Sequence, residues 1–352
     1  PNPRVGCVVV AGERVVGEGW TAPTGGPHAE ARALEVAGAQ ARGATVYVTL
    51  EPCSHFGRTP PCADALVRAG VGRVVVAVRD PHSFVDGTGL ARLEAAGIPV
   101  ATGLLAAEAE ALNAGFFARQ RRGRPWVRLK LAASLDGRTA MASGESQWIT
   151  GAAARRDVQH LRARSCAVVT GVGTVLADDP RLTLRPEELD DLPAFDRAFL
   201  ERVPPLRVVL DGTLRTPPGA RVLQGGRVLL QGTAQASAER RRALLAAGAE
   251  VETLAAGANG GVDLQAVLAG LAARECNEVL LECGPTLAGS ALALGLVDEL
   301  WLYLAPVLLG DRARPLARLG LDAMAERLRL ALRDVAPVGQ DLRLVLTPPE
   351  GL

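Results

Sequence analysis

The chain has 352 residues, of which 48% are hydrophobic and 22% charged, and its formal net charge at pH 7 is +1. This length suggests two domains. This near-neutral charge argues against a large nucleic-acid partner, since proteins that bind nucleic acids usually carry a clear excess of basic residues. We see no secretory signal, no apolar run near the ~20 residues of a membrane span, and too few cysteines, six, for a disulfide scaffold. We therefore expect a cytoplasmic protein.

Short β-rich runs alternate with helical patterns at the start of the chain. We expect strands at 5–10, 13–20, 44–50 and 73–78, one helix beginning near His28, and another over 62–69. This alternation predicts a mostly parallel sheet with helices on its faces. Ligands bind beyond the carboxyl ends of the strands in such sheets, and Cys53 lies at one of those ends.

The stretch 111–126 is basic, contains Gly and Pro, and lacks an apolar period. We interpret it as the connection between two domains, 1–123 and 124–352. A second alternating set of strands follows, interrupted by the acidic, Pro-bounded segment 186–205, which we expect to be a surface insertion. The strand-like runs of the second domain are "WVRLKLAASLDG", "CAVVTGVGTVLADDP", "LRVVLDG", "GRVLLQG", "EVLLECGPT" and "LWLYLAPVLLG".

Two short segments carry residues typical of a zinc site. "PHAEA" at 27–31 supplies His28 and Glu30, and "EPCSHFGRTPPC" at 51–62 supplies Cys53 and Cys62. One imidazole and two thiolates suit tetrahedral Zn²⁺ with a fourth position open for water. In zinc deaminases this H-x-E and P-C pattern makes the glutamate a general acid/base, not a ligand. Bound zinc would lower the pKa of water toward ~7, and Glu30 would move its proton to a ring nitrogen and to the departing ammonia.

A closed structural zinc site is the main alternative, and it needs a fourth protein ligand. His55 is the only obvious candidate, whereas Glu30 would have no purpose in such a site. The other four cysteines lie in apolar, strand-like runs, where we expect small buried hydrophobic residues: Cys7, Cys166, Cys276 and Cys283.

With these residues in place, the sequence resembles the family of bifunctional riboflavin-biosynthesis deaminase–reductases. The usual zinc deaminase has two residues between its cysteines, whereas the eight residues "SHFGRTPP" between Cys53 and Cys62 are characteristic of this family. The resemblance runs from Pro1 to about Gly310. It implies a cytidine-deaminase-like first domain that deaminates 2,5-diamino-6-(5-phosphoribosylamino)pyrimidin-4-one, with one zinc per chain. It also implies a helix before "PNP" that this sequence does not contain, which would leave one sheet face uncovered.

The same resemblance implies roles for single residues of the first domain. His28, Cys53 and Cys62 match the zinc ligands, and Glu30 matches the proton shuttle. The positions that contact the substrate are Asn2, His55, Arg58 and Asp80. From the residues alone, Asn2 and Asp80 could instead cap turns, His55 could pack in its loop, and Arg58 could face solvent. The family often has asparagine where this chain has His82.

The second domain has no G-x-G-x-x-G fingerprint, which makes a Rossmann fold a weak interpretation. "ECGPTLAGS" at 282–290 instead predicts a strand, a tight turn and a helix start, whose amides and positive dipole end suit a dinucleotide phosphate. From this segment alone, an ordinary strand–helix connection is as good an interpretation as a phosphate site. Two polar segments, 129–150 and 171–185, carry further candidates, and Lys130 is the only lysine in the chain.

These segments resemble the family's reductase, which has a dihydrofolate-reductase-like fold and uses NADPH to reduce the ribose of the deaminated product to a ribityl chain. The resemblance implies a cofactor site at Ala132, Trp148, Thr174, Asp178, Gly284, Pro285, Thr286, Leu287, Ala288, Gly289 and Ser290. It implies a substrate site at Ser146, Arg162, Leu182, Arg185 and Glu282. Arg162 and Arg185 could each form forked bonds with the substrate 5′-phosphate. Trp148 could stack on a ring or fill the core, and Asp178 and Glu282 are the candidate proton donors.

Two other functions stay open. The chain could be a deaminase with a non-catalytic, ligand-binding C-terminal domain, or a deaminase of nucleic acids. The near-neutral charge and the 3% aromatic content argue against the second, because strand-binding surfaces need cations and stacking rings. We therefore expect a homo-oligomer that acts on a small pyrimidine nucleotide, without nucleic-acid or membrane partners.

Overall fold

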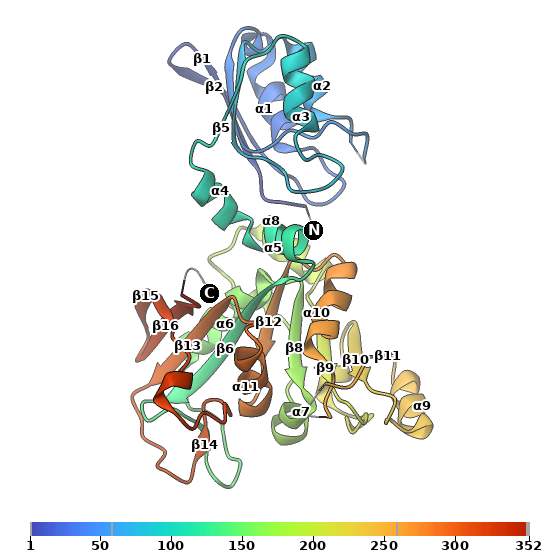
Figure 1. Cartoon of the computed structure of the whole chain (residues 1–352), viewed down its shortest axis with the longest axis vertical. Coiled ribbons are helices and arrows are strands. Elements are labelled where there is room, and N and C mark those ends of the chain that lie inside the picture. The colour runs from blue at the N-terminus through green and yellow to red at the C-terminus, as the bar shows by residue number, and fades with distance from the viewer. Residues whose placement is uncertain (1, 58, 258–259, 350–352) are drawn as a thin grey trace. The chain divides into compact units, whose positions relative to one another are not determined.

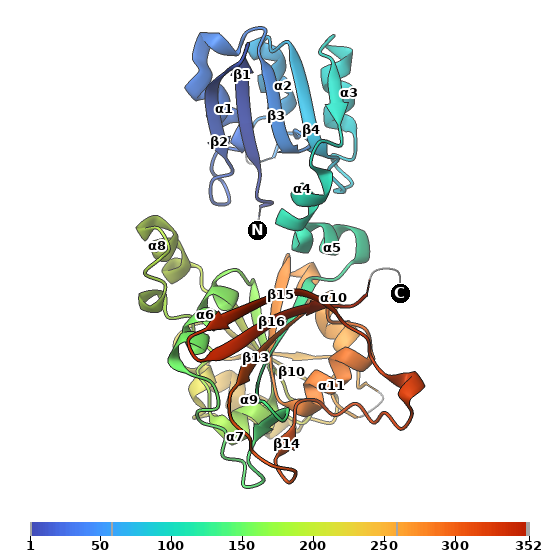
Figure 2. The same cartoon turned by 90° about the vertical axis from the view of Figure 1, so that its left-hand side faces the viewer.

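The computed structural model describes residues 2–57, 59–257 and 260–349, and the chain folds into two compact units, 1–123 and 124–352 (Figures 1 and 2). Each unit is an α/β structure built around its own sheet. Among the described residues, no helix is both long and apolar enough to cross a membrane.

The first unit has a five-stranded sheet in the order β2-β1-β3-β4-β5. Its elements are β1 Gly6–Ala11, β2 Arg14–Trp20, α1 Ala29–Ala37, η1 Gly38–Ala41, β3 Thr45–Leu50, α2 Cys62–Ala69, β4 Arg73–Val78, α3 Thr88–Ala95, β5 Val100–Thr102, α4 Ala106–Leu112 and α5 Ala114–Arg122. The expected strands and helices of this part are present to within one residue. The sheet is mixed rather than mostly parallel. A tight hairpin makes β1 antiparallel to β2, and β1 also pairs antiparallel with β3.

Helix α1 lies against β2 unusually closely. A Cβ atom at Gly17 would lie 2.2 Å from the Ala33 carbonyl oxygen, and one at Gly19 would lie 2.3 Å from that of Ala29. Only glycine permits this approach, which brings the start of α1 to the edge of the sheet where β3 ends. The core beneath α1 and α2 consists of small aliphatic residues from β1, β3 and β4.

The segment 111–126, which we interpreted as the connection between two domains, contains the division between the two units and is largely helical. The segment forms the end of α4, all of α5 and the first residue of β6 (Trp126–Ser134). Phe116 and Phe117 are buried with Leu50 and Val78, so α5 belongs to the core of the first unit. Because α5 is short and buries consecutive residues, its sequence shows no apolar period of 3.6 residues.

The second unit has a nine-stranded sheet in the order β11-β10-β9-β8-β12-β6-β13-β16-β15. In this order, neighbouring strands from β11 through to β13 are parallel to each other. The last two strands, β16 and β15, add an antiparallel edge. Beyond β6, the elements up to η3 are β7 Arg138–Ala140, α6 Ala152–Ala163, β8 Ala167–Gly171, α7 Val172–Asp178, η2 Pro186–Glu188, α8 Ala194–Arg202, β9 Leu206–Leu210 and η3 Arg221–Leu223. The rest are β10 Val228–Gly232, α9 Ala238–Ala246, β11 Glu250–Thr253, α10 Leu264–Ala273, β12 Glu278–Glu282, α11 Pro285–Ala293, β13 Glu299–Ala305, β14 Arg314–Pro315, η4 Met324–Glu326, β15 Ala331–Val338 and β16 Asp341–Thr347.

Helices cover both faces of this second sheet. Residues of α10 and α11 pack on one face in one apolar cluster, and residues of α6 and α9 pack on the other face in a second cluster. The expected insertion at 186–205 contains η2 and α8, and its Leu189 is fully buried. The carboxyl ends of β8, β9 and β12 meet at one edge of the sheet, which is where parallel sheets bind ligands.

Candidate active sites

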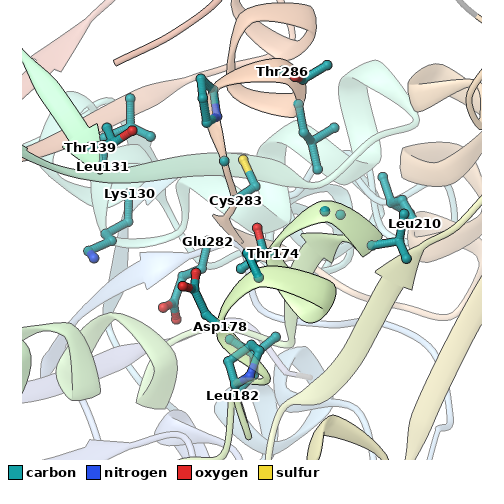
Figure 3. Close-up of a pocket in the computed structure, with 18 of the residues that line it drawn as sticks. Lys130, Leu131, Thr139, Thr174, Asp178, Leu182, Leu210, Glu282, Cys283 and Thr286 are labelled. Carbon is teal, nitrogen blue, oxygen red and sulfur yellow. The ribbon is translucent and has the colours of Figure 1, made fainter. Parts of the chain in front are cut away.

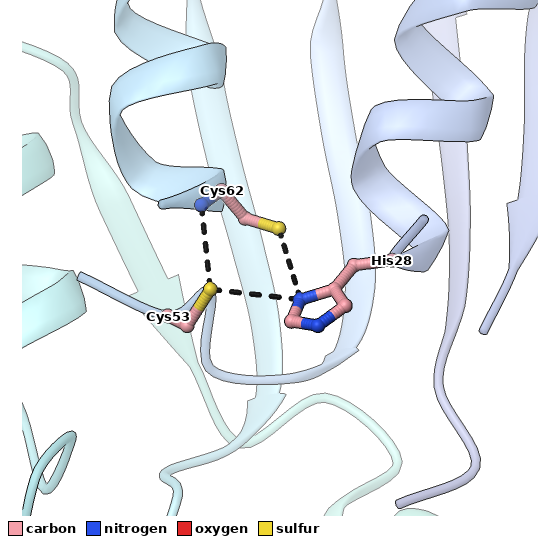
Figure 4. A group of neighbouring side chains, drawn as sticks. All are labelled: His28, Cys53 and Cys62. Carbon is pink, nitrogen blue, oxygen red and sulfur yellow. Dashed lines mark hydrogen bonds between the residues drawn. The ribbon is translucent and has the colours of Figure 1, made fainter. Parts of the chain in front are cut away.

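Three chain segments of the first unit bring His28, Cys53 and Cys62 together (Figure 4). His28 is the residue that caps the start of α1, Cys53 follows β3, and Cys62 is the first residue of α2. The ligand atoms of these three side chains lie within 4.8 Å of one another. His55 does not belong to this group, so among the described residues the cluster has three protein ligands and not four.

The geometry of the cluster fits a tetrahedral metal ion. The His28 Nδ1 atom lies 3.6 Å from the Cys53 sulfur and 3.4 Å from the Cys62 sulfur. Tetrahedral zinc with ordinary Zn–S and Zn–N bonds would place such atoms roughly 3.6 Å apart. The Nε2 atom of His28 lies 3.4 Å from the Thr59 hydroxyl, a contact that orients the ring. Sequence reasoning missed Thr59, although it lies in the insertion between the two cysteines.

The pKa values of the two cysteines are shifted in opposite directions. Hydrogen bonds from Cys62 and His28 lower the pKa of Cys53 to about 4 against the opposing effect of burial, and the backbone amide of Cys62 also donates to the Cys53 sulfur. The pKa of Cys62 is raised, because its thiol donates to Cys53 and is itself buried. A divalent cation would displace the proton of Cys62 and stabilise both sulfurs as thiolates.

Glu30 lies in the first turn of α1 and is only 3% exposed. Burial raises the pKa of its carboxyl to about 7, despite hydrogen bonds that favour the charged form. A carboxyl group with a pKa near neutrality can both accept and return a proton, which is the property that general acid–base catalysis requires.

The structure places the other predicted substrate residues of this unit as follows. Asp80 follows β4 and is buried, which raises its pKa to about 6, and it accepts a hydrogen bond from the His82 amide at 2.8 Å. The exposed His55 ring is 6.3 Å from the ring of Phe84. Asn2 is half-buried in the segment before β1. Arg58 lies outside the described residues.

The second unit contains a large cleft at the carboxyl ends of its parallel strands (Figure 3). Its volume is about 2020 Å³, ample for a dinucleotide and a second ligand. Of the residues expected to bind cofactor or substrate, all but Ala288 and Gly289 line it: Ala132, Ser146, Trp148, Arg162, Thr174, Asp178, Leu182, Arg185, Glu282, Gly284, Pro285, Thr286, Leu287 and Ser290.

A charged group lies at the centre of this cleft. Glu282 on β12 is paired in register with Lys130 on β6, and Arg162 on α6 donates two hydrogen bonds to the Glu282 carboxylate, at 2.6 and 2.9 Å. Burial would raise the pKa of Glu282, but Arg162 and Lys130 outweigh it and keep that pKa low. Burial lowers the pKa of Lys130, although Glu282 opposes this. Lys130 was absent from the predicted site residues. The sequence feature that could have identified it is that it is the only lysine in the chain.

This pairing changes the expected role of Arg162. Its guanidinium group is bound to Glu282 and also donates to the Thr183 carbonyl at 2.8 Å, so its forked geometry faces a protein carboxylate. Arg185 is the more available cation. Its side chain is 44% exposed and lines the same cleft, and among the described residues its ion-pair partner is Glu188, at 2.7 Å.

The start of helix α11 forms another part of the cleft. Gly284 is its N-cap, no side chain caps its amides, and Pro285 is its first residue. A Cβ atom at Gly284 would lie 3.7 Å from the Thr174 hydroxyl, so α7 and α11 approach each other here. Ala288 is fully buried, and a Cβ atom at Gly289 would lie 1.9 Å from the Arg318 carbonyl oxygen. These two residues serve packing, whereas Gly284, Pro285, Thr286 and Leu287 line the cleft.

Trp148 lies on the surface of the cleft and does not fill the core. Its side chain is 68% exposed, and the Arg155 guanidinium lies 4.5 Å above its ring. Ser146 donates a hydrogen bond to Asp178 at 2.8 Å, which joins an expected substrate residue to an expected cofactor residue.

Of the four cysteines outside the zinc cluster, Cys7 and Cys276 are buried as expected. Cys166 and Cys283 are half-buried, and Cys283 lines the cleft.

Two family models match the chain. The model described as the RibD C-terminal domain matches residues 125–344, and the model of the cytidine and deoxycytidylate deaminase zinc-binding region matches residues 1–78. The chain is similar to the riboflavin biosynthesis protein RibD of Escherichia coli, at 49% identity over 98% of this chain and 93% of the relative. RibD of Mycobacterium tuberculosis is 42% identical, over 98% and 91%.

Solved structures agree along the whole chain. RibD of Acinetobacter baumannii is 46% identical with a TM-score of 0.90, and the match covers 99% of this chain and 93% of that one. A diaminohydroxyphosphoribosylaminopyrimidine deaminase/5-amino-6-(5-phosphoribosylamino)uracil reductase from Thermotoga maritima is 30% identical with a TM-score of 0.83, at the same coverage. Both the fold and the order of the two domains are therefore shared.

Proposed function

This chain belongs to the RibD family of bifunctional riboflavin-biosynthesis enzymes, and from that premise we propose how its residues carry the two reactions. The membership confirms the predicted fold class, a cytidine-deaminase-like domain followed by a dihydrofolate-reductase-like domain. It also confirms the predicted function: zinc-dependent deamination of 2,5-diamino-6-(5-phosphoribosylamino)pyrimidin-4-one, then NADPH-dependent reduction of its ribosyl group. The alternative of a non-catalytic C-terminal domain is not favoured.

We propose that His28, Cys53 and Cys62 hold the zinc ion, with one ion per chain. When bound, zinc lowers the pKa of water, so that a nucleophile is available near neutral pH. The buried carboxylate of Glu30 takes one proton from the attacking water to the pyrimidine nitrogen, and it then carries the second proton of that water to the amino group, which leaves as ammonia. The observation that carries this proposal is the three-ligand cluster with Glu30 on the adjoining helix turn.

Asp80 and His55 complete the proposed substrate side of this site. Both lie on loops at the carboxyl ends of strands, Asp80 after β4 and His55 after β3. We assign them, with Asn2 and Arg58, to binding of the pyrimidine nucleotide, and we divide the activities between residues 1–123 and 124–352.

In the second unit, we propose that NADPH lies along the start of α11, with Gly284 to Leu287, Ser290 and Thr174 around its phosphates. When bound, NADPH supplies the hydride. Ala132, Trp148 and Asp178 border the same cofactor. Arg185, Leu182 and Ser146 bind the phosphorylated substrate, and Arg162 orients the Glu282 carboxylate toward it.

The charged centre supports Lys130 as the proton donor to the opening ribose. Glu282 was a candidate, but Arg162 holds it in the ionised form, which has no proton to give. Lys130 lies beside Glu282 on the neighbouring strand, and its burial makes its proton easier to release. Glu282 then positions the ammonium group and keeps it charged between turnovers.

Mass spectrometry of the products tests both activities. The diaminopyrimidine nucleotide is incubated with the full chain, with and without NADPH. We expect the deaminated product alone without NADPH and the reduced, ribityl product with it. An unchanged substrate in both samples would contradict the proposal.

We further propose that the chain is a cytoplasmic homo-oligomer. Exposed apolar residues on the edge strand β15 and on its neighbour β16 support self-association: Leu332, Val335 and Leu342. Light scattering on the purified protein measures the mass directly, and a monomer across the working concentration range would contradict this proposal.

A further inference from the structure

We propose that Glu51 is a positioning residue of the deaminase, whose buried carboxylate holds the loop after β4 against the zinc-binding segment. This inference rests on the proposed function, because it takes the loop that carries Asp80 to face the pyrimidine nucleotide. Glu51 itself is not a ligand of the predicted zinc site, and it immediately precedes the Pro52–Cys53 pair.

The carboxylate of Glu51 accepts four backbone hydrogen bonds, two from the loop after β4 and two from the first turn of α3. Its Oε2 atom accepts from the amides of Asp80 at 3.2 Å and Gly87 at 3.0 Å. Its Oε1 atom accepts from the amides of Gly89 at 2.9 Å and Leu90 at 3.3 Å. Both ends of the loop are therefore attached to a single side chain that is 3% exposed.

Two other contacts join the same segments. The hydroxyl groups of Ser54 and Thr88 are 2.6 Å apart and hydrogen-bonded. A Cβ atom at Gly89 would lie 1.9 Å from the Pro52 carbonyl oxygen, so the start of α3 lies directly against the chain that leads to Cys53. The zinc-binding segment and the loop are thus packed as one structure, and Glu51 supplies most of the hydrogen bonds between them.

The order that Glu51 imposes extends along the loop. Asp80, whose amide is bound to Glu51, accepts from the amide of His82 at 2.8 Å, and the His82 Nδ1 atom accepts from the amide of Phe84 at 3.3 Å. The Phe84 ring lies 5.2 Å from the His82 ring and 6.3 Å from the ring of His55 on the other loop. Fixing Asp80 therefore fixes a group of polar and aromatic side chains beside the zinc cluster.

Glu51 acts through these residues and not on the substrate itself. Each of its oxygens already accepts two hydrogen bonds, and the side chain is buried beneath the loop. A carboxylate is required because it is the one side-chain group that offers two acceptor oxygens and no donor. In Glu51→Gln, one oxygen becomes an NH₂ group that faces two N–H donors, so two hydrogen bonds are lost and the loop is pushed away.

The test uses the full zinc-loaded chain with Glu51→Gln, and Glu94→Gln on the exposed surface of α3 as the matched control. We expect both variants to keep one zinc per chain and wild-type reduction of supplied deaminated substrate. In Glu51→Gln alone, we expect KM for the diaminopyrimidine nucleotide to rise about tenfold or more, with a smaller change in kcat. Hydrogen exchange at Asp80, Gly87, Gly89 and Leu90 should become faster in that variant only.

A wild-type KM in zinc-loaded, active Glu51→Gln would overturn the proposal, even if the loop exchanged faster, because Glu51 would then serve stability alone. If that variant does not fold, Glu51→Asp keeps both acceptor oxygens but shortens the side chain by one methylene. The same result is expected, a raised KM with zinc retained, and a wild-type KM would again overturn the proposal. Failure of the proposed function would look different, since the wild-type chain itself would then release no ammonia.

Discussion

Replacing Glu30 with glutamine tests the deaminase mechanism most directly. Glutamine has nearly the size of glutamate, so it fits the buried position in the first turn of α1, and the three ligand atoms of the zinc cluster are untouched. The amide cannot accept and return a proton. General acid–base groups contribute about 10²–10⁴-fold, or roughly 2.7–5.5 kcal/mol of barrier. We therefore expect Glu30→Gln to keep its zinc and to lose at least about 99% of its deaminase rate.

The assay follows ammonia release from the diaminopyrimidine nucleotide, with zinc measured by mass spectrometry on the same sample. Glu35→Gln is the matched control, since Glu35 lies in the same helix and is exposed, and it should keep wild-type activity. NADPH oxidation on supplied deaminated substrate should be unchanged in both variants. If zinc-loaded Glu30→Gln kept more than a tenth of the wild-type rate, Glu30 would not be the proton shuttle.

Four other perturbations separate the remaining parts of the enzyme. Chelation of zinc should abolish ammonia release but not NADPH oxidation, and loss of both would show that the two sites are not independent. Arg185→Ala should raise the substrate KM of the reductase about tenfold or more, because a bond to a charged group is lost, without a matching change in NADPH affinity. Gly284→Val should instead weaken NADPH binding, as measured by fluorescence titration, and equal effects of the two variants on NADPH would refute separate anion sites. Gly289→Ala should destabilise the second unit by about 1–3 kcal/mol in chemical unfolding, because its Cβ would collide with the Arg318 carbonyl, and an unchanged midpoint would contradict this.

The zinc cluster could be predicted because its ligand residues lie in short, recognisable sequence segments. His28 and Glu30 are two residues apart, and Cys53 follows a strand whose period of two is plain. The metal requires particular ligand atoms, so few alternatives fit these residues. The loop after β4 offered no such signal. The bonds from Glu51 to Asp80 and Gly89 join backbone amides, which every sequence contains, and only the folded chain shows which amides meet the carboxylate.

The reductase centre was harder to predict because its pairs depend on register. Lys130 and Glu282 are neighbours only because β6 and β12 pair in parallel at those residues, and Arg162 reaches Glu282 from a helix 120 residues earlier in the chain. The family resemblance implied a substrate position for Arg162, where a forked bond to the 5′-phosphate was one possible contact. It could not show that a protein carboxylate already occupies the guanidinium group.

Helix geometry explains the remaining difference, at 284–290. A continuous run of residues was expected to bind the cofactor, but α11 begins at Pro285 and turns about 100° with each residue. One side of such a helix faces the cleft, while the side opposite must pack against the protein. Thr286 and Leu287 line the cleft, whereas Ala288 and Gly289 lie against the core and the Arg318 backbone. Gly284 therefore remains the glycine that we propose lets a dinucleotide approach, whereas Gly289 is required for the close approach of a second chain segment.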